Sequence, residues 1–387
     1  MTVAARPAVR PHRYAERIAR AAEALPGRGI DALLIAVGPD LQYLCGYGAM
    51  PLERLTMLVI LPGPEGVRLV VPRLEAAAAT AGCRTPLPIV TWEETEDPHA
   101  LVAGLVRSGR AVDTALRIAV SDRLTAMHLL RLQAALPGAT FSSATTVLRD
   151  LRIVKDEDEF ALLRLAAEAA DRVVAQIAGG RLVGRTEADV AAEVRQRLIA
   201  EGHEEAHFAI VGSGPNSASP HHEASERVIQ PGEPIVLDIG GTLSGYGSDI
   251  TRTLWVTGGD PAKGPDEGFR HLFGVLRTAQ ERATRAVRPG IACEAVDAAA
   301  RSVIDAEGYA ENFFHRTGHG IGLEGHEDPY LVAGNAEPLR EGMAFSVEPG
   351  IYLPGRYGAR IEDIVACGPD GPVVLNEAPR DLYVVSG

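Results

Sequence analysis

The chain has 387 residues, 46% of them hydrophobic, and carries a formal net charge of −13 at pH 7. This length exceeds what one compact core usually supports, so we expect two domains. The negative charge argues against nucleic acid and anionic membranes as main partners, because both bind basic surfaces. No apolar run approaches about eighteen residues, so we expect no membrane span.

The four cysteines are Cys45, Cys83, Cys293 and Cys367, and no two of them form a CxxC pair. Scattered cysteines are typical of reduced intracellular proteins and not of a disulfide framework. The first twenty residues contain five arginines and no apolar run, so we expect no signal peptide. Together these features predict a cytoplasmic protein.

Residues 1–150 alternate between strand-like and helix-like segments. We predict strands at 31–37, 55–61, 67–71 and 117–120, and helices at 13–28, 101–106 and 122–136. Such alternation predicts an α/β domain with a mixed or parallel sheet. Its histidines, His12, His99 and His128, stand apart in the sequence, so we expect surface or packing roles for them. Nothing in this domain indicates catalysis.

The pattern changes near residue 150. Four consecutive acids at 156–159 open a long predicted helix that ends at Gly179, and acids in a first turn suit the helix dipole. A capping-box pattern over 186–189 opens a second helix, which ends at Gly202. These signals mark the start of a second domain.

The rest of the chain combines hairpins with helices. A strand is predicted from residue 208, and further helices are predicted at 265–287 and 293–307. One carboxylate-bearing hairpin precedes these helices and another follows them. Helices around two hairpins predict an α+β domain over 151–387.

Two short motifs match known patterns only in their letters. Residues 203–207 read HExxH, but Gly202 has just closed a helix and a strand follows, whereas a zinc protease needs both histidines on one helical face. Residues 320–325 read GxGxxG, but histidines precede them and no helix is predicted after them, so they do not fit a dinucleotide site. We expect neither motif to be functional in that sense.

Five side chains suited to metal binding lie in apolar, strand-like sequence. They are Asp238, Asp249, His319, Glu348 and Glu362. A lone buried carboxylate costs several kcal/mol in desolvation, so each needs a positive partner. These stretches contain no lysine, and their few arginines do not balance the acids. A pair of divalent ions would balance them.

The spacing of the four acids supports the same hypothesis. Asp238 and Asp249 occupy the two arms of the first predicted hairpin, and Glu348 and Glu362 the arms of the second. Neighbouring strands lie about 4.8 Å apart, so acids on adjoining strands can share two ions about 3.5–4 Å apart. Carboxylates with one imidazole suit manganese, cobalt or zinc, and the lack of thiolate argues against a structural zinc. The alternative is that these acids form buried ion pairs or serve turns.

Five segments in order along the chain resemble one enzyme family. They are residues 212–222, 237–253, 315–330, 346–355 and 359–365. They resemble the pita-bread metallopeptidases, the family of methionine aminopeptidase, aminopeptidase P and prolidase, and among these the proline-specific branch. The resemblance covers essentially all of 151–387 and implies a pita-bread fold for this domain. Residues 1–150 resemble the creatinase-type amino-terminal domain of prolidases.

The resemblance implies roles for individual residues. Asp238, Asp249, His319, Glu348 and Glu362 fall on the five metal-ligand positions for two divalent ions, with Mn²⁺ favoured and Co²⁺ or Zn²⁺ as alternatives. Three residues fall on catalytic positions. His221 and His326 match the histidines that contact the substrate and stabilise the tetrahedral intermediate, and Glu348 matches the proton shuttle.

Other residues have weaker implied roles. His315 matches a histidine of the aminopeptidase P active site, and Arg360 matches an arginine that holds a substrate carboxylate. Arg360 shares a strand face with Glu362, so pairing with that acid is its structural alternative. His222 receives no role. The proline pocket cannot be assigned from the sequence, although Phe208 and Tyr352 are candidates for it or for packing.

The function implied by the resemblance is hydrolysis of the Xaa-Pro bond in dipeptides, as in prolidase. The first alternative is aminopeptidase P, which releases the first residue of longer Xaa-Pro peptides. A metal-free, creatinase-like hydrolase of a small non-peptide C–N bond and a catalytically inactive binding module are further alternatives, but both would be expected to have lost metal ligands. The implied partners are a small peptide with proline in second position and a second copy of the chain in a homodimer.

Overall fold

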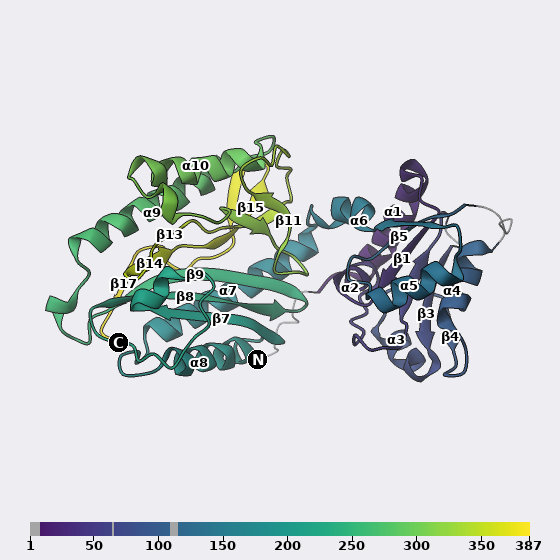
Figure 1. Cartoon of the computed structure of the whole chain (residues 1–387), viewed down its shortest axis with the longest axis horizontal. Helices are drawn as coiled ribbons and strands as arrows, with labels where there is room; N and C mark the ends of the chain where they lie inside the picture. The colour runs from purple at the N-terminus through teal and green to yellow at the C-terminus, as the bar shows by residue number, and fades with distance from the viewer. Residues whose placement is uncertain (1–7, 64–65, 109–114) are drawn as a thin grey trace. The chain divides into compact units, whose positions relative to one another are not determined.

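The computed structural model describes residues 8–63, 66–108 and 115–387 (Figure 1). The chain divides into two compact units, one from Val9 to Arg152 and one that includes Ile153 to Gly387. Each unit has its own sheet and its own buried core. Among the described helices, none combines the length and the apolar character that crossing a membrane requires.

The smaller unit is built on one six-stranded sheet with the order β4-β3-β2-β1-β5-β6. Its strands are β1 (Ala32–Ala36), β2 (Met57–Ile60), β3 (Val67–Pro72), β4 (Ile89–Trp92), β5 (Arg117–Val120) and β6 (Thr140–Ser143). Strand β2 runs antiparallel to β1 and β3, and the other neighbours are parallel. The predicted mixed α/β domain is therefore present.

Helices cover both faces of this sheet. They are α1 (Pro11–Arg28), α2 (Pro39–Cys45), α3 (Ala76–Gly82), α4 (Pro98–Arg107), α5 (Ala126–Ala135) and α6 (Thr145–Arg152). Leu34 of β1 packs in the core formed with α4 and α5, while Leu33 on the opposite face is also fully buried. His99 and His128 are buried as well, with His99 Nε2 3.1 Å from His128 Nδ1. They have the expected packing role, but as a pair.

The described part of the larger unit contains a four-stranded sheet, a five-stranded sheet and a separate two-stranded hairpin. The first has the order β17-β9-β8-β7 and consists of β7 (Glu205–Ser213), β8 (Glu233–Leu243), β9 (Tyr246–Val256) and β17 (Tyr383–Val385). Helices α7 (Glu157–Ala178) and α8 (Glu187–Ala200) pack on it through a buried aliphatic cluster. Both helices begin with a capping box, which the sequence pattern predicts for α8; the capping box of α7 uses Asp156 and Glu159.

The second sheet has the order β11-β10-β12-β15-β16. Its strands are β10 (Gly318–Gly320), β11 (Glu327–Leu331), β12 (Ala344–Val347), β15 (Asp363–Gly368) and β16 (Gly371–Val374). Helices α9 (Glu267–Ala286) and α10 (Cys293–Ala306) cover it, and the hairpin of β13 (Gly350–Leu353) and β14 (Tyr357–Arg360) lies between β12 and β15 in the chain. Within this unit the helices lie outside the two sheets (Figure 1).

The second hairpin differs in one respect from the expectation. The strands that pair are β12 and β15, with Val347 opposite Asp363, and the β13–β14 hairpin is inserted between them. Glu348 and Glu362 therefore lie just beyond the paired strands, where the chain turns into and out of the insertion, and not on two hairpin arms. Glu362 also forms an antiparallel bridge with Thr251 of β9, which joins the two sheets.

Candidate metal centre and active site

Two of the candidate ligands lie on one face of the β8–β9 hairpin. Asp238 is opposite Thr251, and Gly240 is opposite Asp249. Because side chains alternate along a strand, residues 238 and 240 share a face, and so do their partners 249 and 251. Asp238 is 7% exposed and Asp249 4% exposed, so the hairpin places two acids side by side in a buried position.

The other three candidate ligands come from the second sheet. His319 is the central residue of β10, where its N–H donates to Ser346 Oγ at 3.0 Å. The N–H of Glu348 donates to the carbonyl of Thr317, and that of Glu362 to the carbonyl of Thr251. The backbone of each of these candidate ligands is thus held by a hydrogen bond. The bond from Glu362 to Thr251 of β9 also brings the second sheet against the hairpin that carries Asp238 and Asp249.

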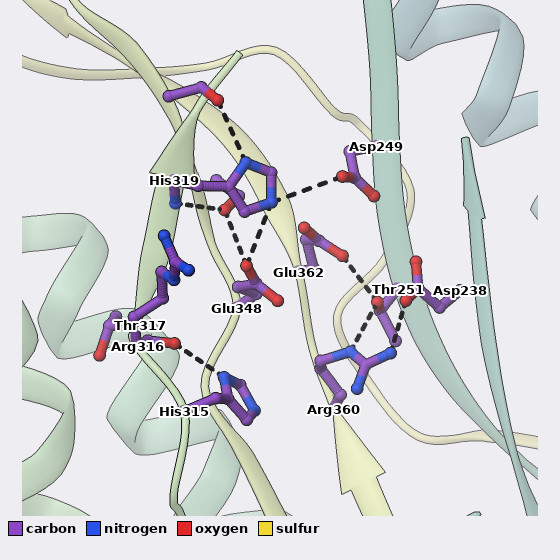
Figure 2. A network of polar contacts seen from close by, with 12 residues as sticks. Asp238, Asp249, Thr251, His315, Arg316, Thr317, His319, Glu348, Arg360 and Glu362 are labelled. Atoms are coloured by element: carbon purple, nitrogen blue, oxygen red, sulfur yellow. Dashed lines mark hydrogen bonds and ion pairs between the residues drawn. The ribbon is translucent and has the colours of Figure 1, made fainter. Parts of the chain in front are cut away.

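The five side chains converge on one point (Figure 2). The Nε2 atom of His319 lies 3.7 Å from an Asp249 oxygen and 3.3 Å from a Glu348 oxygen. Ligand atoms of Asp238, Asp249 and Glu362 lie within 4.8 Å of one another, and so do those of His319, Glu348 and Glu362. The two groups share Glu362, so these five side chains could hold two neighbouring divalent ions.

The electrostatics of this cluster favour added positive charge. Burial, followed by the neighbouring acids, raises the pKa of Asp249 and of Glu362 well above their usual range. Burial raises the pKa of Glu348 to about 7. Burial and the charge of His326 lower the pKa of His319 to about 3, so its imidazole is neutral near pH 7. Without cations, the acids would retain protons that divalent ions displace.

Two further observations fit a metal pair. Asp238 Oδ1 is buried and has no hydrogen-bond partner among the described residues, so it is an acceptor that lacks a cation or donor. His319 Nδ1 donates to the carbonyl of Gly320 at 3.1 Å, which leaves Nε2 unprotonated and directed at the carboxylates. The donor set of oxygens and one imidazole suits divalent ions such as manganese, cobalt or zinc.

Arg360 is bound within the protein. Its Nη2 donates to Asp238 at 2.5 Å and to the carbonyl of Pro220, its Nη1 donates to Tyr352, and its Nε donates to Thr251. Only 2% of Arg360 is exposed. As the strand period predicts, the side chain points toward the candidate ligands, but the acid that it contacts is Asp238 and not Glu362.

His315 is held by a fixed hydrogen-bond chain. Its Nδ1 lies 2.7 Å from the carbonyl of Arg316 and therefore donates, so Nε2 accepts from the Tyr352 hydroxyl at 3.0 Å. Burial, followed by the charge of Arg360, lowers the pKa of His315 to about 4. Tyr352 is fully buried and connects His315 to Arg360, so it does not line an open proline pocket.

The remaining candidate histidines lie around the same cluster. The rings of His326 and His319 are stacked with centroids 3.7 Å apart. Burial, followed by the charges of Arg316 and His221, lowers the pKa of His326. The charge of His221 also lowers the pKa of His315. Both His221 and His326 are exposed, so substrate can reach them.

Phe208 lies on the sheet face that carries the two aspartates. It pairs with Gly240, and a Cβ on that glycine would lie 2.4 Å from the Phe208 ring. Gly240 therefore makes room for the ring beside Asp238. Phe208 is half-buried, which keeps it a candidate for the wall of the substrate pocket.

The buried acid Glu187 organises the loop that carries His221. Its side chain is fully buried at the start of α8, where it accepts hydrogen bonds from the backbone or side chains of four residues: Ser213, Asn216, His222 and Ser225. These contacts hold both ends of the segment around His221. Neither Glu187 nor a role for His222 is apparent from the sequence, because the partners of Glu187 are 26 to 38 residues away along the chain.

We expect Glu187→Gln to lower the free energy of unfolding by about 3 kcal/mol at pH 7. The hydrogen bonds lower the pKa of Glu187 to about 2, although burial opposes them. This stabilisation is therefore complete above the unfolded pKa near 4.5 and is lost as the pH falls toward 2. Denaturant unfolding of the two proteins between pH 7 and pH 2.5 measures it. A constant difference over this range would contradict the assignment.

A matched control is Glu281→Gln, which removes an exposed helical ion pair with Arg285. Because exposed pairs contribute little, we expect this change to alter the unfolding free energy by less than about 0.5 kcal/mol.

The HExxH residues do not form a metal site. Helix α8 ends at Ala200, and β7 begins at Glu205. The His203 ring is buried between the carbonyl of Leu198 and the hydroxyl of Ser248, whereas His207 is exposed and contacts Thr242. The GxGxxG residues leave β10 and lead into β11 instead of a helix. Neither motif has the context that its function requires.

We expect Glu204→Ala to leave peptidase activity within about twofold of the parent protein, because Glu204 lies outside the metal cluster. Its carboxylate accepts a hydrogen bond from the N–H of Ser244 at 2.9 Å in the β8–β9 turn. Loss of this bond should cost about 1 kcal/mol of stability. Steady-state kinetics and thermal unfolding measure both effects, and a collapse of turnover in the folded variant would restore the HExxH hypothesis.

Fold and site together define a metallopeptidase with a two-sheet catalytic domain. The sequence matches the profile of Metallopeptidase family M24 over residues 161–369 and that of the Creatinase/Prolidase N-terminal domain over residues 17–154. The chain belongs to Metallopeptidase family M24. These matches confirm three predictions: the resemblance to the pita-bread metallopeptidases, the α+β domain preceded by a creatinase-type domain, and the prediction that the protein is an enzyme.

Proteins similar to this chain match nearly all of its length. The chain is 48% identical over 375 residues to the "Probable dipeptidase PepE" of Mycobacterium tuberculosis, covering 96% of both chains. It is 32% identical to the "Xaa-Pro dipeptidase" of Pyrococcus horikoshii, covering 95% of this chain and 98% of the relative. The crystal structure of dipeptidase PepE from Mycobacterium ulcerans has a TM-score of 0.88 at 45% identity, covering 98% of this chain and 99% of that one.

Proposed function

We propose that the protein is an Xaa-Pro dipeptidase that uses two divalent metal ions to hydrolyse the bond before proline. The observation that carries this proposal is the convergence of two ligand groups on Glu362, with all ligand atoms of each group within 4.8 Å. The relatives named dipeptidase and Xaa-Pro dipeptidase support the choice of substrate. The presence of all five candidate ligands argues against a creatinase-like hydrolase and against an inactive binding module.

In this proposal the five residues of the cluster hold the ions: Asp238, Asp249, His319, Glu348 and Glu362. Two divalent ions in such a site lower the pKa of water and supply a nucleophile near pH 7. The carboxylates lie on backbone fixed by both sheets, so the reacting groups need no rearrangement during the reaction. We favour Mn²⁺ as the metal, with Co²⁺ or Zn²⁺ as alternatives.

Glu348 is the proposed proton carrier. Its carboxylate lies in the cluster beside His319, where it could accept a proton from the attacking water and return that proton to the proline nitrogen. Ser346 Oγ donates to Glu348 at 3.1 Å and holds the carboxylate beside His319. The proline nitrogen has no hydrogen of its own in the substrate, so its departure depends on this proton.

His221 and His326 are proposed to bind the substrate carbonyl. Both are exposed next to the cluster, and burial lowers the pKa of His326, which keeps that imidazole neutral near pH 7. A neutral imidazole N–H can donate to the oxygen that becomes negative during the reaction. His315 and Phe208 are proposed to line the remaining substrate pocket.

The setting of the enzyme is also a proposal. Four free cysteines support a reducing location such as the cytoplasm. We further propose a homodimer, as the family resemblance implies, with neither nucleic acid nor a membrane as a partner. Size measurement in solution tests the dimer.

The test of the proposed function compares an Xaa-Pro dipeptide with an Xaa-Pro-Yaa tripeptide after metal is removed and Mn²⁺ restored. We expect metal-dependent cleavage of the dipeptide, with the tripeptide cleaved poorly. Preference for the tripeptide would assign the protein to aminopeptidase P with the same site. Cleavage of neither peptide by the metal-loaded protein would contradict the proposed substrate class.

A further inference from the structure

A dipeptide differs from a longer peptide in having its carboxylate on the residue that follows the cleaved bond. This inference rests on the proposed function, because it concerns how the enzyme would bind that carboxylate. A substrate carboxylate is bound best by a cation whose hydrogen-bond donors the protein does not already use. Two arginines, Arg360 and Arg316, lie among the site residues (Figure 2).

Arg360 has little capacity for a substrate. Four of its five N–H groups donate to protein acceptors, and only 2% of the residue is exposed. Its positive charge is already paired with the carboxylate of Asp238, a candidate metal ligand. Withdrawing Arg360 to bind substrate would leave that acid and the Tyr352 hydroxyl without their donor, which is costly in a buried position.

Arg316 differs from Arg360 in its exposure and in its hydrogen-bond partners. It is exposed, and the described residues offer its guanidinium neither a hydrogen bond nor an ion pair. The guanidinium carbon lies 4.5 Å from the centroid of the Tyr330 ring, a contact that orients the group and leaves its N–H edge free. Figure 2 draws Arg316 between His315 and His319 among the site residues.

The backbone under Arg316 is fixed on both sides. His315 donates to the carbonyl of Arg316, and Arg301 donates to the carbonyl of His315 at 2.9 Å. On the other side, the N–H and hydroxyl of Thr317 donate to the buried acid Asp297. The side chain therefore starts from a rigid base beside the metal ligands and ends in solvent.

The position of Arg316 follows from its tyrosine contact. Tyr330, the ring under the guanidinium, pairs with the candidate ligand His319 across β10 and β11. Because directly paired residues of an antiparallel ladder lie on one face of the sheet, Tyr330 lies on the His319 face. The guanidinium is therefore held beside the candidate metal ligands (Figure 2).

We propose that Arg316 is the cation that binds the C-terminal carboxylate of the dipeptide and thereby sets the preference for dipeptides. The planar guanidinium can form two parallel hydrogen bonds with a carboxylate. In this arrangement Arg360 is a positioning residue that holds Asp238, and the role first assigned to Arg360 from the family resemblance belongs to Arg316.

The experiment pairs two substrates with three variants. The substrates are Ala-Pro and Ala-Pro-amide, which differ only in the charge of the C-terminal group. The variants are Arg316→Ala, Arg316→Lys and, as a matched control, Arg356→Ala, because Arg356 is also an exposed arginine over a tyrosine ring. Bound metal and thermal unfolding of each variant establish that the site and the fold are intact.

We expect Arg316→Ala to raise KM for Ala-Pro by about 30- to 100-fold, with kcat changed by less than about fivefold, because a charge-assisted contact to bound substrate is lost. Turnover of Ala-Pro-amide should stay unchanged. Arg316→Lys should recover part of the loss, and Arg356→Ala should behave as the parent. Equal losses for both substrates, or no loss for either, would overturn the proposal.

A binding measurement separates this proposal from the proposed function. Calorimetry with free proline and prolinamide needs no turnover, so it applies even if the parent protein cleaves neither substrate. Selective loss of proline binding in Arg316→Ala would support the carboxylate contact even then. Proline binding that survives the substitution would overturn it, even in an active Xaa-Pro dipeptidase.

Discussion

Asp249→Ala is expected to lower the hydrolysis of an Xaa-Pro dipeptide by at least about 100-fold and to reduce the bound metal below two ions per chain. Ligand atoms of Asp249 lie within 4.8 Å of those of Asp238 and Glu362, and also within 4.8 Å of those of His319 and His326. Only 4% of Asp249 is exposed. The other described acids of the cluster, Asp238, Glu348 and Glu362, are themselves candidate ligands, so none of them is spare to replace Asp249. Metal analysis and steady-state kinetics on the same sample measure the effect.

The same variant also separates a metal ligand from a structural acid. Repulsion from Asp238 and Glu348 adds to burial in raising the pKa of Asp249, so the metal-free protein gains little from this carboxylate. We expect metal-free Asp249→Ala to unfold at the same temperature as the metal-free parent or higher. Full activity with two bound ions, or a large loss of stability in the metal-free state, would contradict the assignment.

Metal affinity is expected to fall as the pH drops below about 7, with protons released on binding. Glu348 has a pKa of about 7, and the pKa values of Asp249 and Glu362 are well above their usual range. Protonated acids must lose their protons before they bind cations, so binding should strengthen as the pH rises through 7. Titration calorimetry with Mn²⁺ at pH 6 and pH 8, in buffers of different ionisation enthalpy, counts the protons.

The control for this prediction is Glu348→Gln, which removes the group whose pKa is about 7. We expect it to release fewer protons at pH 6 than the parent and to bind Mn²⁺ more weakly. Affinity that does not change between pH 6 and pH 8, without proton release, would show that the acids are not occupied by protons in the metal-free protein.

The candidate ligands could be predicted from sequence because the chemistry is local. Asp238 and Asp249 stand in strands whose neighbours are apolar, and a hairpin brings such residues together without long-range information. The helix starts at 157 and 187 were equally visible, because caps depend on three or four consecutive residues. The HExxH and GxGxxG motifs could be set aside for the same reason.

Long-range contacts could not be predicted. Glu187 is one acid in a first helical turn, and only the folded structure brings the 213–225 segment to it. The pairing of Arg360 with Asp238 joins residues 122 positions apart, and strand periodicity gave the direction of the side chain without its partner. The inserted β13–β14 hairpin also changed where Glu348 and Glu362 lie, because turn positions and strand arms look alike in sequence.

The most direct test of the two-metal peptidase is turnover of an Xaa-Pro dipeptide measured against equivalents of Mn²⁺ added to metal-stripped protein. We predict no turnover without metal and a rise that reaches its plateau at two ions per chain, as the two ligand groups that share Glu362 require. Full turnover in the stripped protein, or a plateau at one ion per chain, would contradict the account.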